Sequence, residues 1–147
     1  MTLRTLHGDL FHSAAQTLTN PINCQAVMGG GLAMEFRLRF PSMFEDYAQR
    51  CGCGEVRIGR PYVWHNFSGR PSVLNFPTKD DWKAPSRLEY IAEGLRYLVD
   101  HYLEMGITSL AFPALGCGLG GLEWSEVRPL MERELLRLSI PVEIFEP

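Results

Sequence analysis

The strongest structural signal in this chain is the segment Ser109-Leu-Ala-Phe-Pro-Ala-Leu-Gly-Cys-Gly-Leu-Gly-Gly-Leu-Glu-Trp124. It opens with a short apolar run between breakers, which is typical of a buried strand. Glycines then occupy positions 116, 118, 120 and 121, and apolar residues recur at helical spacing from Trp124 to Leu135. Glycine lets the backbone approach a ligand closely, and a helix N-terminus is partly positive. Strand, glycine loop and helix together therefore predict a phosphate or diphosphate site.

Two known phosphate-binding patterns do not explain this loop. Gly116, Gly118 and Gly121 match the G-x-G-x-x-G spacing of dinucleotide-binding folds. That pattern normally opens its domain, whereas here only one helix and one strand remain before Pro147. A P-loop is excluded because no Gly-Lys-Ser/Thr follows the glycines. A tight turn that binds nothing remains an alternative.

A second strand, glycine loop and helix lie nearer the N-terminus. We expect a strand over 16–23 that breaks at Asn20-Pro21, followed by Met28-Gly-Gly-Gly31 and a helix. That helix has Leu32, Phe36 and Phe40 on one face and stops at Pro41. Two such units in one small domain favour a ligand with two phosphates, or a phosphate and a sugar, held between them. The alternative is two unrelated turns.

The remaining segments alternate between strand and helix patterns. A capping box of Ser86 and Glu89 predicts the start of one helix, and Gly106 its end. The other expected elements are strands at Leu3–Leu6, within 55–67 near a sheet edge, at 71–79 and at Pro141–Phe145, and a short helix at Met43–Cys51.

This alternation predicts an α/β fold with a mostly parallel sheet covered on both faces. Ligands of such sheets bind outside the carboxyl ends of the strands. The residues that follow strands should therefore meet at one rim: Asp9, Asn23, Gly29 to Gly31, Lys79 and Gly116 to Gly121. Asn75 and Thr78 are polar residues beside an apolar run, so we expect them at the mouth of their strand.

Composition bounds the remaining possibilities. A chain of 147 residues with 46% hydrophobic and 21% charged residues predicts one globular domain, without a membrane span or signal peptide. A net charge of −3 argues against gripping duplex nucleic acid by bulk charge. The cations are twelve arginines and two lysines, and both lysines, Lys79 and Lys83, lie in one short segment. The four cysteines and four histidines show no disulfide framework or metal spacing, which indicates reduced thiols, a cytoplasmic location and no metal or cofactor.

Five motifs together make the whole chain resemble a macro domain. They are Gly8-Asp9, Asn20-x-x-Asn23, Met28-Gly-Gly-Gly-Leu-Ala33, Asn75-Phe-Pro-Thr-Lys79 and Pro113-Ala-Leu-Gly-Cys-Gly-Leu-Gly-Gly121. The last two are most similar to the DarG-type antitoxins and the terminal ADP-ribose glycohydrolases. The resemblance implies a single macro domain over 1–147, a three-layer α/β/α sandwich with a six-stranded mixed sheet, and ADP-ribose as ligand.

The resemblance also implies roles for individual residues. Asp9 would accept a hydrogen bond from the adenine amine, although a turn or cap aspartate is the alternative, and Phe145 would stack on adenine or belong to the core. The second glycine loop would hold the diphosphate, while Asn23 and the first glycine loop would hold the distal ribose. The full expected ligand-binding set is Asp9, Leu10, Asn23, Met28, Gly29, Gly30, Gly31, Leu32, Thr78, Leu115, Gly116, Cys117, Gly118, Leu119, Gly120, Gly121 and Phe145.

Lys79 is the expected catalytic residue, because a lysine at this position acts on the anomeric carbon of the distal ribose in the resembling hydrolases. An amine with the ordinary pKa of about 10.4 is protonated at neutral pH, so a nucleophilic role requires that its pKa be lowered. The alternative role is a positive charge that stabilises the leaving group. The terminal glycohydrolases have an aspartate where this chain has Gly120, which leaves the acid partner unidentified. Asp80 and Asp81 are near in sequence, but their direction is open.

The implied function is hydrolysis of ADP-ribose from thymine in single-stranded DNA, which would reverse a DNA-modifying ADP-ribosyltransferase toxin. Alternatives are protein de-ADP-ribosylation, dephosphorylation of ADP-ribose-1″-phosphate, or a reader that binds ADP-ribose without turnover. The implied partners are ADP-ribose, modified single-stranded DNA and a cognate toxin. The antitoxins carry a further toxin-binding region, so the chain fits either an excised domain or a stand-alone enzyme.

Overall fold

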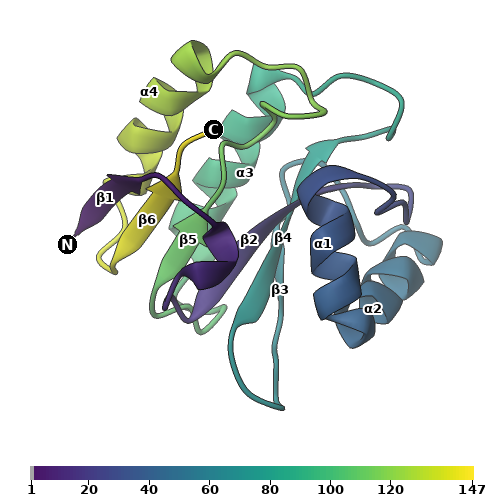
Figure 1. The fold of residues 1–147 in the computed structure, drawn as a ribbon. Helices are drawn as coiled ribbons and strands as arrows, with labels where there is room; N and C mark the ends of the chain where they lie inside the picture. Colours follow the sequence, from purple (N-terminus) through teal and green to yellow (C-terminus); the bar gives the residue numbers. More distant parts are fainter. Residues whose placement is uncertain (1) are drawn as a thin grey trace.

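The fold is a six-stranded sheet between two layers of helices, seen in a computed structural model that describes residues 2–147 (Figure 1). The strands are β1 (Leu3–Leu6), β2 (Thr17–Asn23), β3 (Tyr62–Trp64), β4 (Ser72–Lys79), β5 (Leu110–Phe112) and β6 (Val142–Phe145). The helices are α1 (Gly31–Arg39), α2 (Pro41–Gly52), α3 (Leu88–His101), α4 (Trp124–Leu135) and the short η1 (Leu10–His12). The strand order is β1-β6-β5-β2-β4-β3, with every pair parallel except β3–β4. The predicted α/β/α sandwich with a mixed sheet is confirmed.

Strand residues alternate between two apolar cores, one on each face of the sheet. In β5, Leu110 and Phe112 pack into the core under α3 and α4, while Ala111 faces the core under α1 and α2. In β4, Val73 and Leu74 divide in the same way. Side chains alternate because the strand is pleated. Since each face of the sheet is covered by a core, nearly every residue of the central strands is buried.

The expected strand break at Asn20-Pro21 is wrong. Strand β2 runs through Pro21, which pairs with Phe76 of β4, and continues to Asn23 with a register shift after Ile22. Proline lacks a backbone N–H, so a central strand tolerates it only where no partner needs that donor. On the other side of β2 the pairing with β5 covers Thr17 and Leu18 only, so Pro21 lies beyond it.

The capping box is also wrong, because α3 begins at Leu88 after Arg87, with no side-chain cap. Ser86 is buried under the second glycine loop instead. Its backbone N–H donates to Gly120 O at 2.9 Å, and its hydroxyl has no hydrogen-bond partner within residues 2–147.

Asn75 does not lie at the mouth of its strand. It is fully buried in the sheet, where its Oδ1 accepts a hydrogen bond of 3.0 Å from Asn20 and its Nδ2 donates to the Tyr62 hydroxyl at 3.3 Å. Burial raises the pKa of Tyr62, so this hydroxyl keeps its proton. The ladder ties β2, β4 and β3 together below the rim.

The expected helix end at Gly106 is wrong, because α3 ends at His101 and Gly106 lies in the turns that follow it. The remaining boundaries agree closely with expectation. The α1–α2 corner falls at Phe40-Pro41, and the edge strand is confirmed at β3, although it is shorter than the segment that contains it. No helix in residues 2–147 has both the length and the apolar character to cross a membrane.

Gly94 is where α3 packs most closely on the sheet, because a Cβ at this position would overlap the ring of Phe76. We expect Gly94→Ala to lower the free energy of unfolding by roughly 1–3 kcal/mol in urea denaturation, since Phe76 is fully buried and cannot swing away. Gly52→Ala, whose Cβ would meet open space at the end of α2, should show no loss. Equal stability of the two variants would contradict this account of α3 packing.

Candidate functional site

A cavity of about 1250 Å³ lies along the carboxyl ends of the parallel strands. It is lined by residues that follow β1, β6, β5, β2 and β4, which is their order across the sheet. The expected convergence on one rim is therefore what the structure shows for Asp9, Asn23, Gly29 to Gly31, Lys79 and Gly116 to Gly120.

The structure brings sixteen of the eighteen expected site residues to this cavity. In addition to the rim residues just named, these are Leu10, Met28, Leu32, Thr78 and Phe145, with Cys117, Gly118 and Leu119 inside the second loop. Residues that sequence reasoning missed also line it, among them Gly8, Pro21, Ile22, Val27, Ala33, Trp82, Pro113, Ala114, Leu122, Glu123, Trp124, Glu146 and Pro147. Most are neighbours of the motifs. Trp82 and Trp124 are large aromatic residues that come just after a motif, and this position is the sequence signal that could have identified them as lining residues.

Two of the expected ligand-binding residues do not belong to the cavity lining. Leu115 is fully buried in the core under α3 and α4, which its side chain enters from the turn that follows β5. Gly121 lies outside the cavity, and its N–H donates to Gly118 O at 3.2 Å to close a turn. The Leu115 side chain and the Gly121 N–H are therefore not free to bind a ligand in this cavity, and a ligand contact at either residue stays a prediction.

The second glycine loop presents three consecutive free donors. Within residues 2–147 the N–H groups of Gly118, Leu119 and Gly120 have no acceptor, whereas those of Cys117, Gly121 and Leu122 bond inside the loop. Successive unpaired N–H groups form a concave anion-binding site. Helix α4 starts only at Trp124, after Glu123 as its N-cap. The loop backbone, not the helix end, is therefore the candidate anion site.

The first glycine loop adds a helix N-terminus. Gly31 begins α1 with φ +57°, a conformation that favours glycine, and Gly30 caps the helix without any side-chain bond. The N–H groups of Gly29, Gly30 and Gly31 have no acceptor within residues 2–147. The two loops meet across the cavity, since a Cβ at Gly30 would lie 3.5 Å from Leu119 Cδ1.

Asn23 is used mainly to shape the segment that leads to this loop. Its Oδ1 accepts from Gln25 N–H at 2.9 Å, and its Nδ2 donates to Val27 O at 2.7 Å. The Tyr47 hydroxyl lies 2.8 Å from both Asn23 O and Asn23 Oδ1. These bonds hold Ala26 at φ 62°, an unfavourable conformation for a residue with a side chain. One Nδ2 hydrogen of Asn23 remains for a ligand.

Lys79 ends β4 at the far side of the cavity from Asp9. It is half-buried, and its Nζ donates to Trp82 O at 3.4 Å. Within residues 2–147 it forms no salt bridge. Asp80 and Asp81 do not line the cavity, and Asp81 Oδ1 accepts from Lys83 N–H at 2.9 Å.

Gly120 leaves no room for the acid found there in the terminal glycohydrolases. A Cβ at Gly120 would overlap Gly116 O and Ser86 Oγ. The carboxylates that do line the cavity are Asp9, Glu123 and Glu146. None of them pairs with Lys79 within 4.0 Å in the part of the chain that the structure describes.

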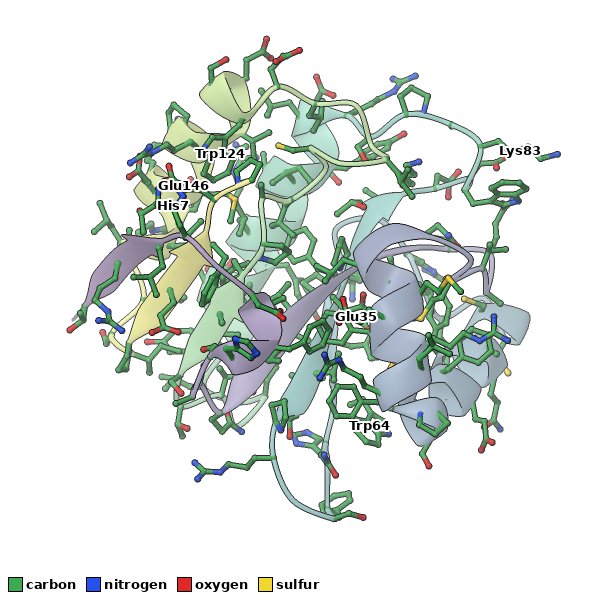
Figure 2. All side chains as sticks on the ribbon, in the orientation of Figure 1. His7, Glu35, Trp64, Lys83, Trp124 and Glu146 are labelled. Carbon is green, nitrogen blue, oxygen red and sulfur yellow. The ribbon has the colours of Figure 1, made fainter. Side chains whose placement is uncertain are left out.

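The opposite end of the cavity is polar and aromatic. Asp9 Oδ1 accepts from Phe11 N–H at 2.9 Å and so caps η1, which leaves its other oxygen as an acceptor. Phe145 lines the cavity and packs against the core under α1 and α2, so its stacking on adenine stays a prediction. Figure 2 shows Trp124, Glu146 and His7 clustered here, and Glu146 binds all of Arg128, His7 and Trp124.

The thiols near the site are poor candidates for chemistry. Burial, and next Glu123, raise the pKa of Cys117 to about 11, and burial raises the pKa of Cys24 to about 12. Both thiols are therefore neutral at physiological pH. No group of three or more metal-ligating side chains occurs within residues 2–147.

A smaller hollow of about 630 Å³ lies against α2 and β3. Its two arginines are already paired, Arg39 with Glu35 at 3.0 Å and Arg50 with Asp46 at 2.9 Å. The larger cavity, with unpaired donors at both glycine loops, is the better anion site.

The family model described as Macro domain matches residues 19–131. This chain is a macro domain. It is 43% identical to a DNA ADP-ribosyl transferase–DNA ADP-ribosyl glycohydrolase fusion protein of Thermosipho africanus, over 99% of this chain and 42% of the relative. It is 38% identical to a DNA ADP-ribosyl glycohydrolase of Thermus aquaticus, over 99% of this chain and 41% of the relative.

Solved structures agree with this assignment. Thermosipho africanus DarTG in complex with ADP-ribose superposes with a TM-score of 0.96 at 44% identity, covering 99% of this chain and 42% of that one. This macro domain therefore spans about two fifths of the length of the curated relatives that it matches first.

The Asn23 network gives a test of how the macro domain orders its site. Tyr47→Phe should speed amide hydrogen exchange at Gln25 and Val27 and cost about 1–2 kcal/mol of unfolding free energy, because Asn23 loses a buried donor. Tyr97→Phe is the matched control, since the Tyr97 hydroxyl forms no hydrogen bond within residues 2–147. Unchanged exchange in Tyr47→Phe would mean that the hydroxyl does not order this segment.

Proposed function

We propose that this macro domain is an ADP-ribosyl glycohydrolase that removes ADP-ribose from thymine in single-stranded DNA. The observation that carries the proposal is the order of groups along the rim. Asp9 and Phe145 lie at one end, unpaired N–H groups in the middle, and Asn23 and Lys79 at the other end. ADP-ribose has the same order of adenine, diphosphate and distal ribose.

The dimensions of the rim suit a ligand of this length. Asp9 follows β1 and Lys79 ends β4, four strand spacings apart, which is roughly 19 Å. In the proposed pose the adenine amine donates to Asp9, and the diphosphate accepts bonds from Gly118 to Gly120 and from the start of α1. Each charge-assisted bond contributes about 1.5–3 kcal/mol. The anomeric carbon of the distal ribose then lies beside Lys79.

Hydrolysis breaks the bond between the anomeric carbon and the base nitrogen, adds water oxygen to the carbon and returns a proton to the base. No carboxylate pairs with Lys79 in the described chain, so the lysine must supply the main electrostatic effect. As an ammonium it stabilises negative charge that develops on the leaving base. As a free amine it attacks the anomeric carbon while the bond to the base breaks and the base takes up a proton, and water then displaces the amine to give free ADP-ribose.

The printed functions of the relatives favour DNA as the target. The Thermus aquaticus protein is named a DNA ADP-ribosyl glycohydrolase, and the Thermosipho africanus protein joins that activity to a DNA ADP-ribosyl transferase. We extend this to the present chain, with a cognate transferase toxin as partner, a role in DNA repair and a cytoplasmic location. The treatment of 1–147 as a single macro domain belongs to the same proposal.

A turnover assay with three substrates tests the function. Thymine-linked ADP-ribose in a single-stranded oligonucleotide should be hydrolysed fastest, ahead of an ADP-ribosylated protein and ADP-ribose-1″-phosphate. Binding of ADP-ribose without release from any of the three would instead identify a reader.

Gly118→Glu should abolish ADP-ribose binding in calorimetric titration, because it places a carboxylate among the N–H groups meant for the diphosphate. The variant should fold, since a side chain at Gly118 points into open space. Gly52→Glu adds the same charge at the end of α2 and should bind normally. Unchanged ADP-ribose affinity in a folded Gly118→Glu variant would mean that the diphosphate does not bind at this loop.

Lys79→Ala should lower turnover on ADP-ribosylated DNA by at least about 100-fold. ADP-ribose affinity should change much less, because backbone groups hold the diphosphate. Lost rate with retained affinity marks an interaction made mainly in the transition state. A wild-type rate in Lys79→Ala would remove this residue from the mechanism.

Lys79→Arg separates the two roles of the lysine. Arginine keeps the charge but stays protonated, with a pKa above about 12. Activity in Lys79→Arg would favour charge stabilisation. An inactive arginine variant, together with a lysine adduct trapped by borohydride, would favour the nucleophilic amine.

A further inference from the structure

Trp82 and Lys83 closely follow Lys79 in the chain, beside the distal end of the cavity. Lys79 and Trp82 both line the cavity, and the Lys79 ammonium bonds to the Trp82 carbonyl at 3.4 Å. If the glycosidic bond lies beside Lys79, the group attached to ADP-ribose emerges past Trp82. Trp124 and Phe145, the other large aromatic residues of the lining, lie at the opposite end. Figure 2 shows Lys83 on the side of the molecule away from Trp124 and Glu146.

The segment that carries Trp82 is held by its backbone. Trp82 N–H donates to Gln25 Oε1 at 3.3 Å, and Ala84 N–H donates to Asp81 O at 3.0 Å. Cys24 N–H donates to Asp80 O at 3.4 Å, which ties the segment to the end of β2. The indole is therefore offered to solvent from an ordered turn.

The Trp82 indole is an exposed aromatic surface beside a cation. Trp82 is 48% exposed although the Lys83 ammonium lies 5.4 Å from its ring centroid, so a large apolar face and a cation stand together at the cavity mouth. Lys79 and Lys83 are the only lysines of a chain with net charge −3. A nucleic acid strand gains little from the overall charge, so its attraction must come from such a local group.

We infer that Trp82 and Lys83 hold the nucleic acid outside the cavity, with a base of the single strand stacked on Trp82 and a backbone phosphate on Lys83. This rests on the proposed DNA substrate and identifies the residues that recognise it. An indole beside a cation suits a single strand, because every base has a flat face and each nucleotide brings a phosphate. A protein substrate offers neither regularly.

Binding to inactive protein tests the inference independently of turnover. In a Lys79→Ala background, a thymine-modified single-stranded oligonucleotide should bind more tightly than free ADP-ribose. Adding Trp82→Ala should remove roughly 5- to 150-fold of affinity for the oligonucleotide and leave that for free ADP-ribose within about twofold. Trp82→Phe should retain most of the higher affinity for the oligonucleotide over free ADP-ribose. Phe67→Ala removes a 97% exposed aromatic side chain outside the cavity and should have no effect.

Salt dependence tests the phosphate contact. Lys83→Ala should reduce the slope of log affinity against log salt by about 0.7 for the single strand. Arg96→Ala, an exposed cation of α3 outside the cavity, should leave the slope unchanged.

The outcomes separate this inference from the proposed function. If the oligonucleotide binds no more tightly than ADP-ribose, or if Trp82→Ala weakens both equally, the inference is overturned even when the wild type hydrolyses modified DNA. An equal Trp82-dependent advantage for an ADP-ribosylated peptide would also overturn it. If the advantage depends on Trp82 but the wild type turns over no DNA substrate, the recognition surface stands and the glycohydrolase proposal fails.

Discussion

The site depends on backbone N–H groups that the fold leaves without partners. A run of unpaired backbone donors at Gly118, Leu119 and Gly120 must be met by water or an anion. Gly118 and Leu119 are exposed, so solvent reaches them, whereas Gly120 is buried. In a parallel sheet such unpaired backbone donors can occur only at the rim, where strands end and loops begin. The same rim places Gly29 to Gly31 opposite, where a Cβ on Gly30 or Gly31 would contact Leu119 of the second loop.

Glycine is required in these loops for two separate reasons. Gly31 and Gly116 adopt positive φ, which side chains disfavour. Gly120 has no such φ, but its Cβ would overlap Gly116 O and Ser86 Oγ. The loop that forms the anion site therefore excludes an acid at Gly120 sterically, and Lys79 is left as the principal charged group at the distal end. This constraint is why the proposed mechanism gives the lysine its central role.

The strand and helix order, the two glycine loops and the rim were predictable, because periodicity and breakers are local signals and parallel strands end on one edge. The errors arose where tertiary contacts override local preference. Pro21 stays in β2 because β5 no longer pairs at that point. Ser86 does not cap α3, because its backbone N–H bonds to Gly120 O in the glycine loop. Asn75 does not reach the rim, because it bonds to Asn20 inside the sheet.

Within the site, the sequence could locate the loops but not which of their groups are free. Gly118 and Gly121 look equivalent in sequence, yet only the N–H of Gly121 closes a turn. Likewise Leu115 lies inside a motif, but its side chain packs into the core under α3 and α4. The shaping role of Asn23 depends on Tyr47, which is 24 residues away and carries no motif.

Amide resonances followed during an ADP-ribose titration test the central claim most directly. The account predicts that the amide protons of Gly118, Leu119, Gly120 and Gly29 to Gly31 shift downfield as they acquire phosphate acceptors, while that of Gly121, already bonded within the loop, moves less. Binding of ADP-ribose that leaves these amides unmoved, or that shifts resonances around Arg39 and Trp64 instead, would contradict it.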